Sequence, residues 1–256
     1  MQVYAWLLLP TVLLLPLGAW SGEIIGGRVA EPHSRPYMAF LSRETSTDTK
    51  MCGGFLVRKD FVLTAAHCAE GDITVFLGAH NISKWERSQQ VIPARTKIPH
   101  PEYDEETDNN DIMLLQLRRK AKLTRWVKTI PLPCADETVQ PGAKCSVAGW
   151  GWTSADSEET SDTLQEVDVK VMRDDVCWST PNGPHENYDP STMLCAGDPD
   201  EGKNPSKGDS GGPLVCGRTA QGIVSCGFGN GTPLAVYTRV STFIPWIHGT
   251  MKKLQP

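Results

Sequence analysis

Ser210 lies in a stretch whose neighbours suit catalysis. Residues 207–214 read Lys-Gly-Asp-Ser-Gly-Gly-Pro-Leu, so Asp209 precedes the serine and small residues flank it on both sides. Glycines let the backbone approach a substrate closely. A serine hydroxyl is a weak nucleophile alone and needs a base and donors for a developing oxyanion. A lone stretch of this kind is more often a tight surface turn, so other residues must supply these groups.

A base and a carboxylate occur in two further stretches. His67 ends a Thr-Ala-Ala-His run after apolar residues, and Asp111 comes directly before the apolar residues 112–115. One histidine among six is weak evidence for a base, and an aspartate before an apolar run is more often a cap. Together with Ser210, these residues supply the three groups of nucleophilic acyl transfer. That chemistry needs no metal and no organic cofactor, and the absence of a Cys-x-x-Cys pair gives a zinc site little support.

The composition limits the class of protein. The 256 residues are enough for one large all-β domain or two small ones, and 39% apolar residues suit a globular chain with a sizeable core. The net charge of −5 disfavours a nucleic-acid-binding protein, because neutralising phosphates needs a basic face.

The N-terminus is typical of a secretory signal. Residues 4–17 are apolar, and Ala19 and Ser21 offer small side chains for cleavage. A membrane anchor is the alternative, but the run is short and contains Pro10 and Pro16. We expect a signal peptide at residues 1–21, no membrane span, and an oxidising compartment in which disulfides form.

Short β-rich runs separated by turn residues follow the signal. They predict a barrel or sandwich with strands at residues 55–57, 61–64, 74–77, 112–117, 145–149, 167–172, 222–225 and 235–240. Polar loops are expected at residues 43–50, 100–110, 153–162, 179–191 and 198–206. Near the C-terminus, an apolar stripe from Phe243 to Leu254 predicts a helix capped by Ser241 or Thr242. That stripe would pack on the core or, less commonly, bind a membrane.

Four motifs in this order resemble the chymotrypsin-like serine proteases: Ile-Ile-Gly-Gly at residues 24–27 and the stretches around His67, Asp111 and Ser210. The resemblance extends from Ile24 to about Leu254. It implies an all-β fold of two antiparallel six-stranded Greek-key β-barrels with a C-terminal α-helix. The expected protease domain is residues 24–256, with barrels at about 24–130 and 131–240 and the helix at 241–254.

The resemblance also assigns roles to residues. Ser210 would be the nucleophile, His67 the general base and acid, and Asp111 the group that orients the imidazole; the backbone N–H groups of Gly208 and Ser210 would bind the oxyanion. The new terminal ammonium of Ile24 would pair with Asp209 after removal of residues 22–23.

An acidic dipeptide that ends in Glu23 is similar to the propeptides of granule proteases: granzymes, chymases and cathepsin G. The run Leu-Gly-Ala-His-Asn-Ile at residues 77–82 also resembles that group. A dipeptidyl peptidase would then activate the enzyme. The group implies storage in secretory, cytolytic granules and a granzyme-like role in immune or cytotoxic proteolysis.

Five residues are expected to bind the substrate. Alignment to the family places Asn204 at the base of the specificity pocket, Gly227 on its wall and Ala235 near its back, with Ser225 and Lys207 beside the cleft. Without an acid at Asn204 or Ala235, cleavage after Lys or Arg is disfavoured, and without an arginine at Ala235 so is cleavage after Asp. A neutral pocket favours chymase-like cleavage after Phe, Tyr, Leu or Met, and Lys207 would favour acidic residues after the cut. Elastase-like or dual specificity is an alternative, as is a catalytically silent binding or antimicrobial homologue.

Eight cysteines allow about 105 full pairings, among which the sequence alone does not choose. The family resemblance implies the disulfides Cys52–Cys68, Cys145–Cys216 and Cys177–Cys195. Cys134 and Cys226 are left over; buried free thiols are the commoner outcome, and an intermolecular bridge through Cys134 is the alternative. Sequons at Asn81 and Asn230 predict two glycosylation sites.

Charge sets the chain apart from basic granule proteases that bind sulfated proteoglycan. Removal of residues 1–23 takes away one acid, Glu23, and leaves a net charge of −4. A local basic run is present at Arg118, Arg119, Lys120, Lys122 and Arg125. We therefore expect protein and peptide substrates and serpin-type inhibitors as partners, with proteoglycan as a further candidate.

Overall fold

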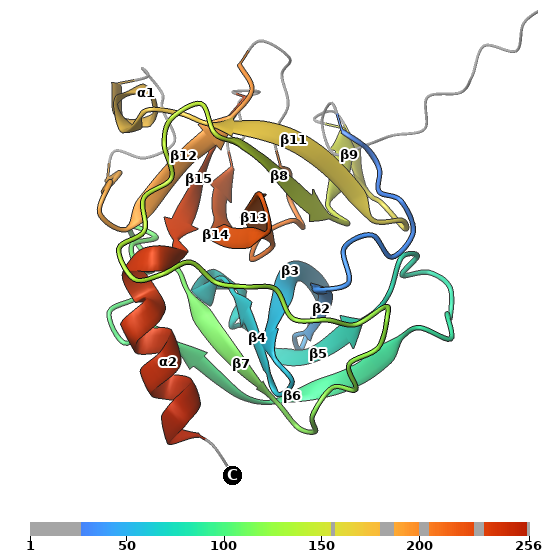
Figure 1. Cartoon of the computed structure of the whole chain (residues 1–256). Helices are drawn as coiled ribbons and strands as arrows, with labels where there is room; N and C mark the ends of the chain where they lie inside the picture. The colour runs from blue at the N-terminus through green and yellow to red at the C-terminus, as the bar shows by residue number, and fades with distance from the viewer. Residues whose placement is uncertain (1–26, 155–156, 180–186, 200–204, 228–232, 255–256) are drawn as a thin grey trace, which may run out of the picture.

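The computed structural model describes residues 27–154, 157–179, 187–199, 205–227 and 233–254. Two closed β-barrels, one above the other in Figure 1, make up most of it. Each barrel has six antiparallel strands, and a short helix lies near the C-terminus. This architecture confirms the predicted fold.

The first barrel is formed by the N-terminal half of the described chain. Around the barrel the strand order is β2-β3-β4-β7-β6-β5. The strands are β2 (Met38–Glu44), β3 (Thr49–Arg58), β4 (Phe61–Thr64), β5 (Asp72–Leu77), β6 (Gln90–Pro99) and β7 (Met113–Leu117).

The second barrel closes by pairing β8 with β11. Its strands are β8 (Lys144–Gly149), β11 (Gln165–Val171), β12 (Met193–Gly197), β13 (Pro213–Cys216), β14 (Thr219–Gly227) and β15 (Leu234–Arg239). The short strand β1 (Arg28–Val29) adds to β11 from outside, so the N-terminal segment reaches across to the second barrel.

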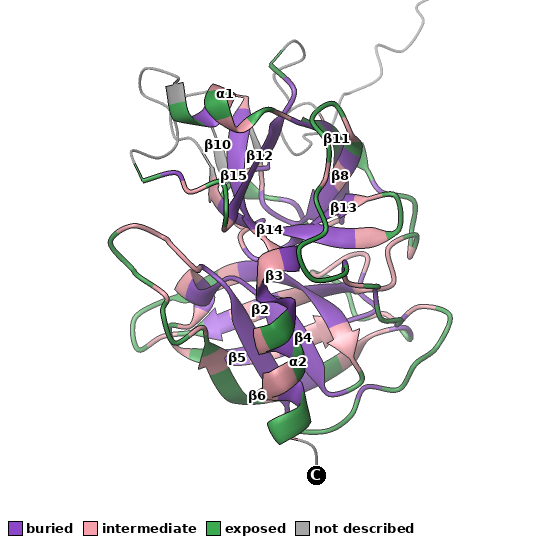
Figure 2. Ribbon diagram, turned by 60° about the vertical axis from the view of Figure 1, so that its left-hand side comes forward, coloured by how far each residue is buried: buried purple, intermediate pink, exposed green. Residues whose placement is uncertain are grey.

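Apolar side chains fill both barrels. Figure 2 shows many residues of the strands of both barrels as buried. The core of the first barrel continues into Val215, Ala220 and Ile223 of the second, so the two barrels share one packed boundary. Trp150, after β8, is almost fully buried there; its indole N–H donates to the carbonyl of His80, and its ring meets the edge of Phe40. This packing fixes how the barrels, and hence the residues at their boundary, lie relative to each other.

The C-terminal segment forms the 3-10 turn η2 (Val240–Phe243) and the helix α2 (Ile244–Lys253). The predicted caps are wrong: Phe243 occupies the N-cap and makes no side-chain cap, while Thr242 Oγ1 donates to the carbonyl of Ser191. Ile244, Ile247 and Met251 pack into the core of the first barrel. The stripe is therefore a core face, which removes the membrane-binding alternative.

Several predicted loops contain regular structure. β2 and β3 extend into the predicted loop 43–50, and the predicted loop 153–162 contains much of the hairpin β9 (Trp152–Ser154) and β10 (Ser157–Thr160). The short helix α1 (Asp174–Ser179) reaches the predicted loop 179–191. β6 was not predicted because only Ile92 of its ten residues is buried, which leaves no apolar alternation. Within the described ranges, no helix is long and apolar enough to cross a bilayer.

Candidate active site

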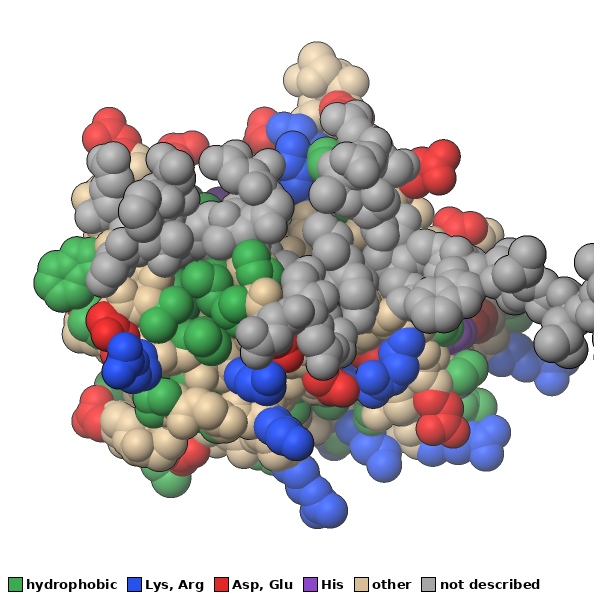
Figure 3. Space-filling view, turned by 90° about the horizontal axis from the view of Figure 1, so that it is seen from above, with side chains coloured by type: hydrophobic (Ala, Val, Ile, Leu, Met, Phe, Trp, Pro, Cys, Tyr) green, Lys and Arg blue, Asp and Glu red, His purple; other side chains and the backbone are tan. Residues whose placement is uncertain are grey.

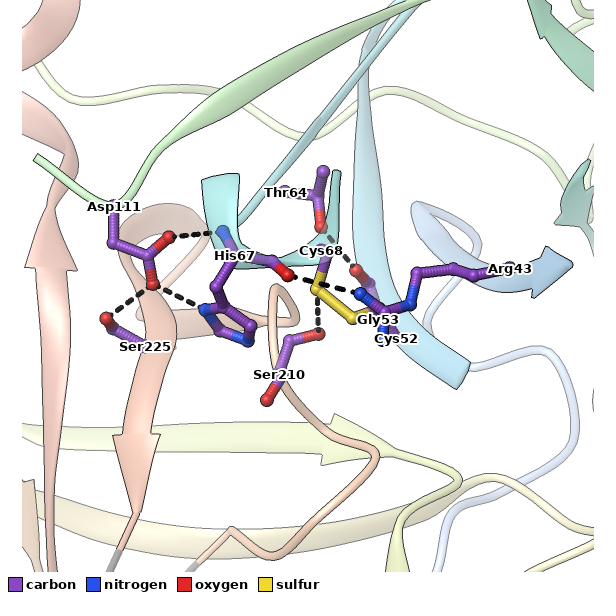
Figure 4. Close-up of a disulfide and its surroundings, with 9 residues drawn as sticks. All are labelled: Arg43, Cys52, Gly53, Thr64, His67, Cys68, Asp111, Ser210 and Ser225. Carbon is purple, nitrogen blue, oxygen red and sulfur yellow. Dashed lines mark hydrogen bonds and ion pairs between the residues drawn. A yellow bond between two sulfur atoms is a disulfide. The ribbon is translucent and has the colours of Figure 1, made fainter. Parts of the chain in front are cut away.

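His67, Asp111 and Ser210 meet at the boundary between the barrels. His67 is in the 3-10 turn η1 (Ala66–Cys68) directly after β4, and Asp111 comes two residues before β7, the strand that pairs with β4. Ser210 lies in the loop before β13 of the second barrel. In Figure 4 the imidazole of His67 lies between the Asp111 carboxylate and Ser210. The two barrels thus contribute different members of one cluster.

Asp111 holds His67 by two hydrogen bonds. Nδ1 of the imidazole lies 2.7 Å from Asp111 Oδ2, and the backbone N–H of His67 donates to Oδ1 at 2.9 Å. Ser225 Oγ donates to Oδ2 at 2.6 Å, and Thr238 Oγ1 donates to the Asp111 carbonyl at 2.7 Å. With Asp111 fully buried, these contacts fix both its backbone and its carboxylate.

The electrostatics of the pair favour a charged carboxylate. Burial raises the pKa of Asp111, but the hydrogen bond and charge of His67 and the hydrogen bond from Ser225 outweigh it, so the pKa falls below its ordinary value. Burial lowers the pKa of His67, but the hydrogen bond and charge of Asp111 outweigh that effect and raise it. The carboxylate therefore stays ionised and stabilises a protonated imidazole.

The loop around Ser210 adopts a conformation that favours glycine. Gly208 and Gly211 have φ values of +97° and +83°. A Cβ on Gly211 would overlap Thr64 Oγ1 and the Gly53 carbonyl, so the loop sits tightly against the first barrel. The Ser210 carbonyl accepts a hydrogen bond from Gly53 N at 2.7 Å, and Cys68 Sγ lies 3.8 Å from it.

The donors around Ser210 are free to act. Among the described residues, the backbone N–H groups of Gly208 and Ser210 donate to no protein acceptor. In the same set, Ser210 Oγ makes no hydrogen bond to His67; such contacts are commonly long without substrate. Two backbone N–H groups in the loop of Ser210 are thus left without an acceptor among the described residues, and donors of this kind bind an oxyanion where both point at it.

Asp209 points away from Ser210 into a fully buried position. Its carboxylate accepts hydrogen bonds from the backbone N–H groups of Gly151 and Ser206, each at 2.9 Å, and from Ser206 Oγ at 3.3 Å. Burial nevertheless raises the pKa of Asp209 to about 6. Ile24, the expected partner of this carboxylate, lies outside the described residues, so the pair remains a prediction.

The expected substrate-binding residues are placed in part. Gly227 of β14 pairs with the fully buried Ala235 of β15. Ser225 reaches Asp111 as described above, and Lys207 Nζ lies 4.5 Å from the centre of the Trp152 ring. Asn204 lies outside the described residues.

β14 offers an open edge beside Ser210. Its pairing with β13 ends at Ile223, and Gly211 and Gly212 exchange the next hydrogen bonds with Val224. Within the described ranges, residues 225–227 continue without a β13 partner on that side. An extended peptide can pair with such an edge.

The structure contains the disulfides Cys52–Cys68, Cys145–Cys216 and Cys177–Cys195, the pairs implied by the family resemblance. Cys134 and Cys226 are free, as expected, but the expectation that they are buried is wrong: Cys134 is exposed and Cys226 is half-buried. Cys52 and Cys68 also lie close to His67, but their disulfide leaves no thiolate to bind a metal there.

The two sequons have different outcomes. Asn81 is half-buried, and its Oδ1 accepts hydrogen bonds from Ser83 N and Ser83 Oγ at 3.0 and 2.8 Å. Asn230 lies outside the described residues. Glycosylation at both positions remains a prediction.

Sequence reasoning missed three polar residues around the site. Thr238 and Thr64 fix backbone carbonyls, of Asp111 and Gly53 respectively, and Asp108 accepts a hydrogen bond from Cys226 Sγ at 3.2 Å. No local motif marks Thr238 or Asp108, because each becomes a neighbour only through strand pairing or barrel packing. Thr64 begins the Thr-Ala-Ala-His run, but its contact with the Gly53 carbonyl was not predicted. The only sequence signal for Asp108 was that it is an acidic residue three positions before Asp111.

Comparisons with known proteins agree on one family. The trypsin family model matches residues 24–247. Duodenase-1 of Bos taurus is 56% identical over 96% of each chain, and granzyme B of Homo sapiens is 54% identical over 96% of this chain and 98% of its own. A solved structure described as "Structure of GrC" is 47% identical, with a TM-score of 0.83, and covers 90% of this chain and 100% of its own.

Proposed function

Since the chain belongs to the trypsin family and is a serine endopeptidase, we propose that Ser210, His67 and Asp111 are its catalytic triad. The observation that carries this proposal is the 2.7 Å contact between Asp111 and His67 Nδ1, which leaves Nε2 of the ring for Ser210. A buried carboxylate that holds Nδ1 fixes the tautomer in which Nε2 accepts a proton.

Peptide hydrolysis would then proceed through an acyl-enzyme. Ser210 Oγ attacks the peptide carbonyl carbon as His67 Nε2 takes the hydroxyl proton, and the carbonyl oxygen becomes an oxyanion bound by the N–H groups of Gly208 and Ser210. His67 returns the proton to the leaving amine as the C–N bond breaks. A water molecule, deprotonated by His67, then attacks the ester and releases Ser210. Each oxyanion donor contributes roughly 3–4 kcal/mol to the transition state.

The specificity we propose is cleavage after Phe, Tyr, Leu or Met. Gly227 and Ala235 are small and uncharged where they pair, which supports a pocket that admits an apolar side chain and offers Lys or Arg no carboxylate at these two positions. Elastase-like and dual specificities are the alternatives, which a peptide profile separates. On the leaving side, the exposed Lys207 ammonium over Trp152 favours acidic residues.

Activation is proposed to follow removal of residues 1–21 as a signal and of residues 22–23 by a dipeptidyl peptidase. The new ammonium of Ile24 would pair with Asp209, whose buried carboxylate lacks a cationic partner among the described residues. Residues 24–256 form the proposed protease domain, with the limits at residues 130 and 240 given above.

Relatives such as granzyme B support a wider role. We place this chain among secreted, granule-stored proteases that act on proteins in immune or cytotoxic proteolysis, with serpin-type inhibitors as partners. Proteoglycan is a further candidate partner. Figure 3 shows acidic and basic side chains side by side among the described residues of the face seen from above. We propose the basic run at residues 118–125 as the proteoglycan contact.

An activity-based label tests the triad directly. The activated protein is treated with a peptide phosphonate that carries Phe, and the labelled residue is located by mass spectrometry. Labelling of Ser210, lost in Ser210→Ala, is the expected result. No labelling of the correctly activated protein would favour the catalytically silent alternative. A peptide library then measures the cleaved residue, and dominant cleavage after Lys or Arg would contradict the proposed specificity.

A further inference from the structure

Asp108 lies beside the catalytic cluster without a role in the chemistry above. It belongs to the segment between β6 and β7, has a φ of +52°, and is half-buried. Cys226, the neighbour of Ser225 on β14, donates its thiol hydrogen to Asp108 Oδ2 at 3.2 Å. Burial, with the Asp108 charge, raises the pKa of Cys226 to about 12, so the thiol remains protonated and acts as a donor. One hydrogen bond thus ties Asp108 to the open end of β14.

Among the described residues, no cation balances the charge of Asp108. In the described part of the chain, no Lys or Arg side chain forms an ion pair with it. Its negative charge acts on His67 together with that of Asp111. The hydroxyl of Tyr103, which also faces these carboxylates, is buried and unpaired in the described structure, and burial with these charges raises its pKa. A half-buried carboxylate of this kind attracts a positive charge.

A substrate bound to the open edge of β14 would bring its side chains to this carboxylate. Successive side chains of an extended peptide point to opposite sides. If the side chain at the cleaved bond enters the pocket beside Gly227, the preceding side chain points to the other side, where His67 and Asp108 lie. This step rests on the proposed function, because it uses the proposed pocket and nucleophile.

We propose that Asp108 is a specificity-determining residue: it selects Lys or Arg at the substrate position directly before the cleaved residue. The carboxylate pairs with the ammonium or guanidinium of that residue, while the Cys226 thiol keeps the carboxylate oriented. The enzyme therefore recognises a basic residue followed by the residue that fills its pocket, and an acidic residue at the same position is repelled by Asp108.

Matched peptides test this selection. Three fluorogenic peptides share the best cleaved residue from the library and differ only before it, with Lys, Gln or Glu. For wild type, we expect kcat/KM to be at least about tenfold higher for Lys than for Glu, with Gln between them; a factor of ten corresponds to about 1.4 kcal/mol. In Asp108→Asn, the Lys-to-Glu ratio should fall close to one. Asparagine suits the test because it tolerates a positive φ and still accepts a hydrogen bond from Cys226.

The matched control is Glu105→Gln, which removes one exposed charge from the same segment. It should keep the wild-type ratio, whereas a ratio lost equally in both variants would assign the preference to the general charge of the segment and overturn the proposal. Equal rates for Lys and Glu in wild type, or a ratio unchanged in Asp108→Asn, would also overturn it. Phosphonate titration of Ser210 counts active enzyme in every sample. If no peptide is cleaved and Ser210 is not labelled, the proposed function itself fails; turnover without the basic preference rejects only the role of Asp108.

Discussion

At the scale of single residues, the position and charge of the Asp111 carboxylate depend on its other hydrogen-bond donors as much as on His67. Ser225 was expected to face the substrate, yet its hydroxyl donates to Asp111 Oδ2, the same oxygen that contacts His67 Nδ1. A buried carboxylate keeps its charge only with such donors. Ser225 therefore helps to hold the charge that stabilises the imidazolium.

Ser225→Ala should lower kcat/KM roughly tenfold to a hundredfold, because a hydrogen bond to a charged group contributes about 1.5–3 kcal/mol. The rate is measured with one neutral peptide on enzyme counted by phosphonate titration. Ser191→Ala is the matched control, since that hydroxyl donates to Asp189 and not to a residue of the triad. Equal rates for both variants would show that the Ser225 hydroxyl is dispensable.

The pH dependence at the acid end should follow His67. Because the pKa of His67 is raised, kcat/KM should rise with pH with a midpoint above the ordinary histidine value of about 6.5. Two carboxylates, Asp111 and Asp108, favour the protonated ring, while Arg43 disfavours it. Asp108→Asn should therefore move the midpoint to lower pH, as measured on the Gln peptide. A midpoint that stays in place, or that moves equally in Glu105→Gln, would contradict this assignment.

At the scale of elements, the Asp209 carboxyl group packs against the backbone at the end of β8. A Cβ on Gly149 or Gly151 would overlap the Asp209 carboxyl group. Glycine is thus required at both positions because the Asp209 side chain approaches the backbone closely. The sequence shows Gly149 and Gly151 on either side of Trp150, but not that a carboxylate from a loop sixty residues later packs against them.

Gly149→Ala should destabilise the fold by about 1–3 kcal/mol, as overpacking of a buried site does, and should remove most activity by displacing Asp209. Gly249→Ala is the opposite case, because its Cβ in α2 meets nothing within 4 Å. It should stabilise by about 0.5–1 kcal/mol through helix propensity. Urea unfolding measures both, and similar effects of the two substitutions would contradict the close packing at Gly149.

The strands that the sequence predicted well are those with buried, β-branched or aromatic runs. β4 matches its expected bounds, and β8 differs by one residue. β6 escaped detection because it is mostly exposed, and the hairpin of β9 and β10 because its residues are mostly polar. β2, β12 and β13 were also not predicted, although most of their residues are buried. Motifs brought the triad candidates to notice, but the positions of Ser225, Thr238 and Asp108 depend on pairing between strands far apart in sequence.

At the scale of the whole molecule, the proposed pairing of Ile24 with Asp209 would link activation to stability. In the uncut chain the Ile24 nitrogen is in a peptide bond and carries no charge, and burial holds the pKa of Asp209 at about 6. The folded state then binds a proton more tightly than the unfolded state. Stability of the uncut chain is therefore lost as pH rises from about 4 to about 6.

Cleavage before Ile24 should remove that loss, because a paired carboxylate has a lower pKa. The stability of the activated form relative to the uncut form should grow by about 3 kcal/mol between pH 4 and pH 7. Urea unfolding of both forms in the Ser210→Ala background measures this without autolysis. A difference that does not change with pH would refute the pairing of Ile24 with Asp209, and activated protein with an acetylated Ile24 should behave like the uncut form.

The placement of the disulfides also determines whether the molecule can refold after a cut between the barrels. Cys52–Cys68 lies within the first barrel, and the other two disulfides lie within the second, so none joins the barrels. The connection after β7 begins with the exposed Arg118, Arg119 and Lys120. One cut there by a protease specific for basic residues would place His67 and Ser210 on separate polypeptides. The two fragments would still be held together by non-covalent contacts. In the N-terminal fragment β1 pairs with the second barrel, and in the C-terminal fragment α2 packs on the first. The first full unfolding after such a cut would then be a one-way event, since the fragments would diffuse apart even under oxidising conditions.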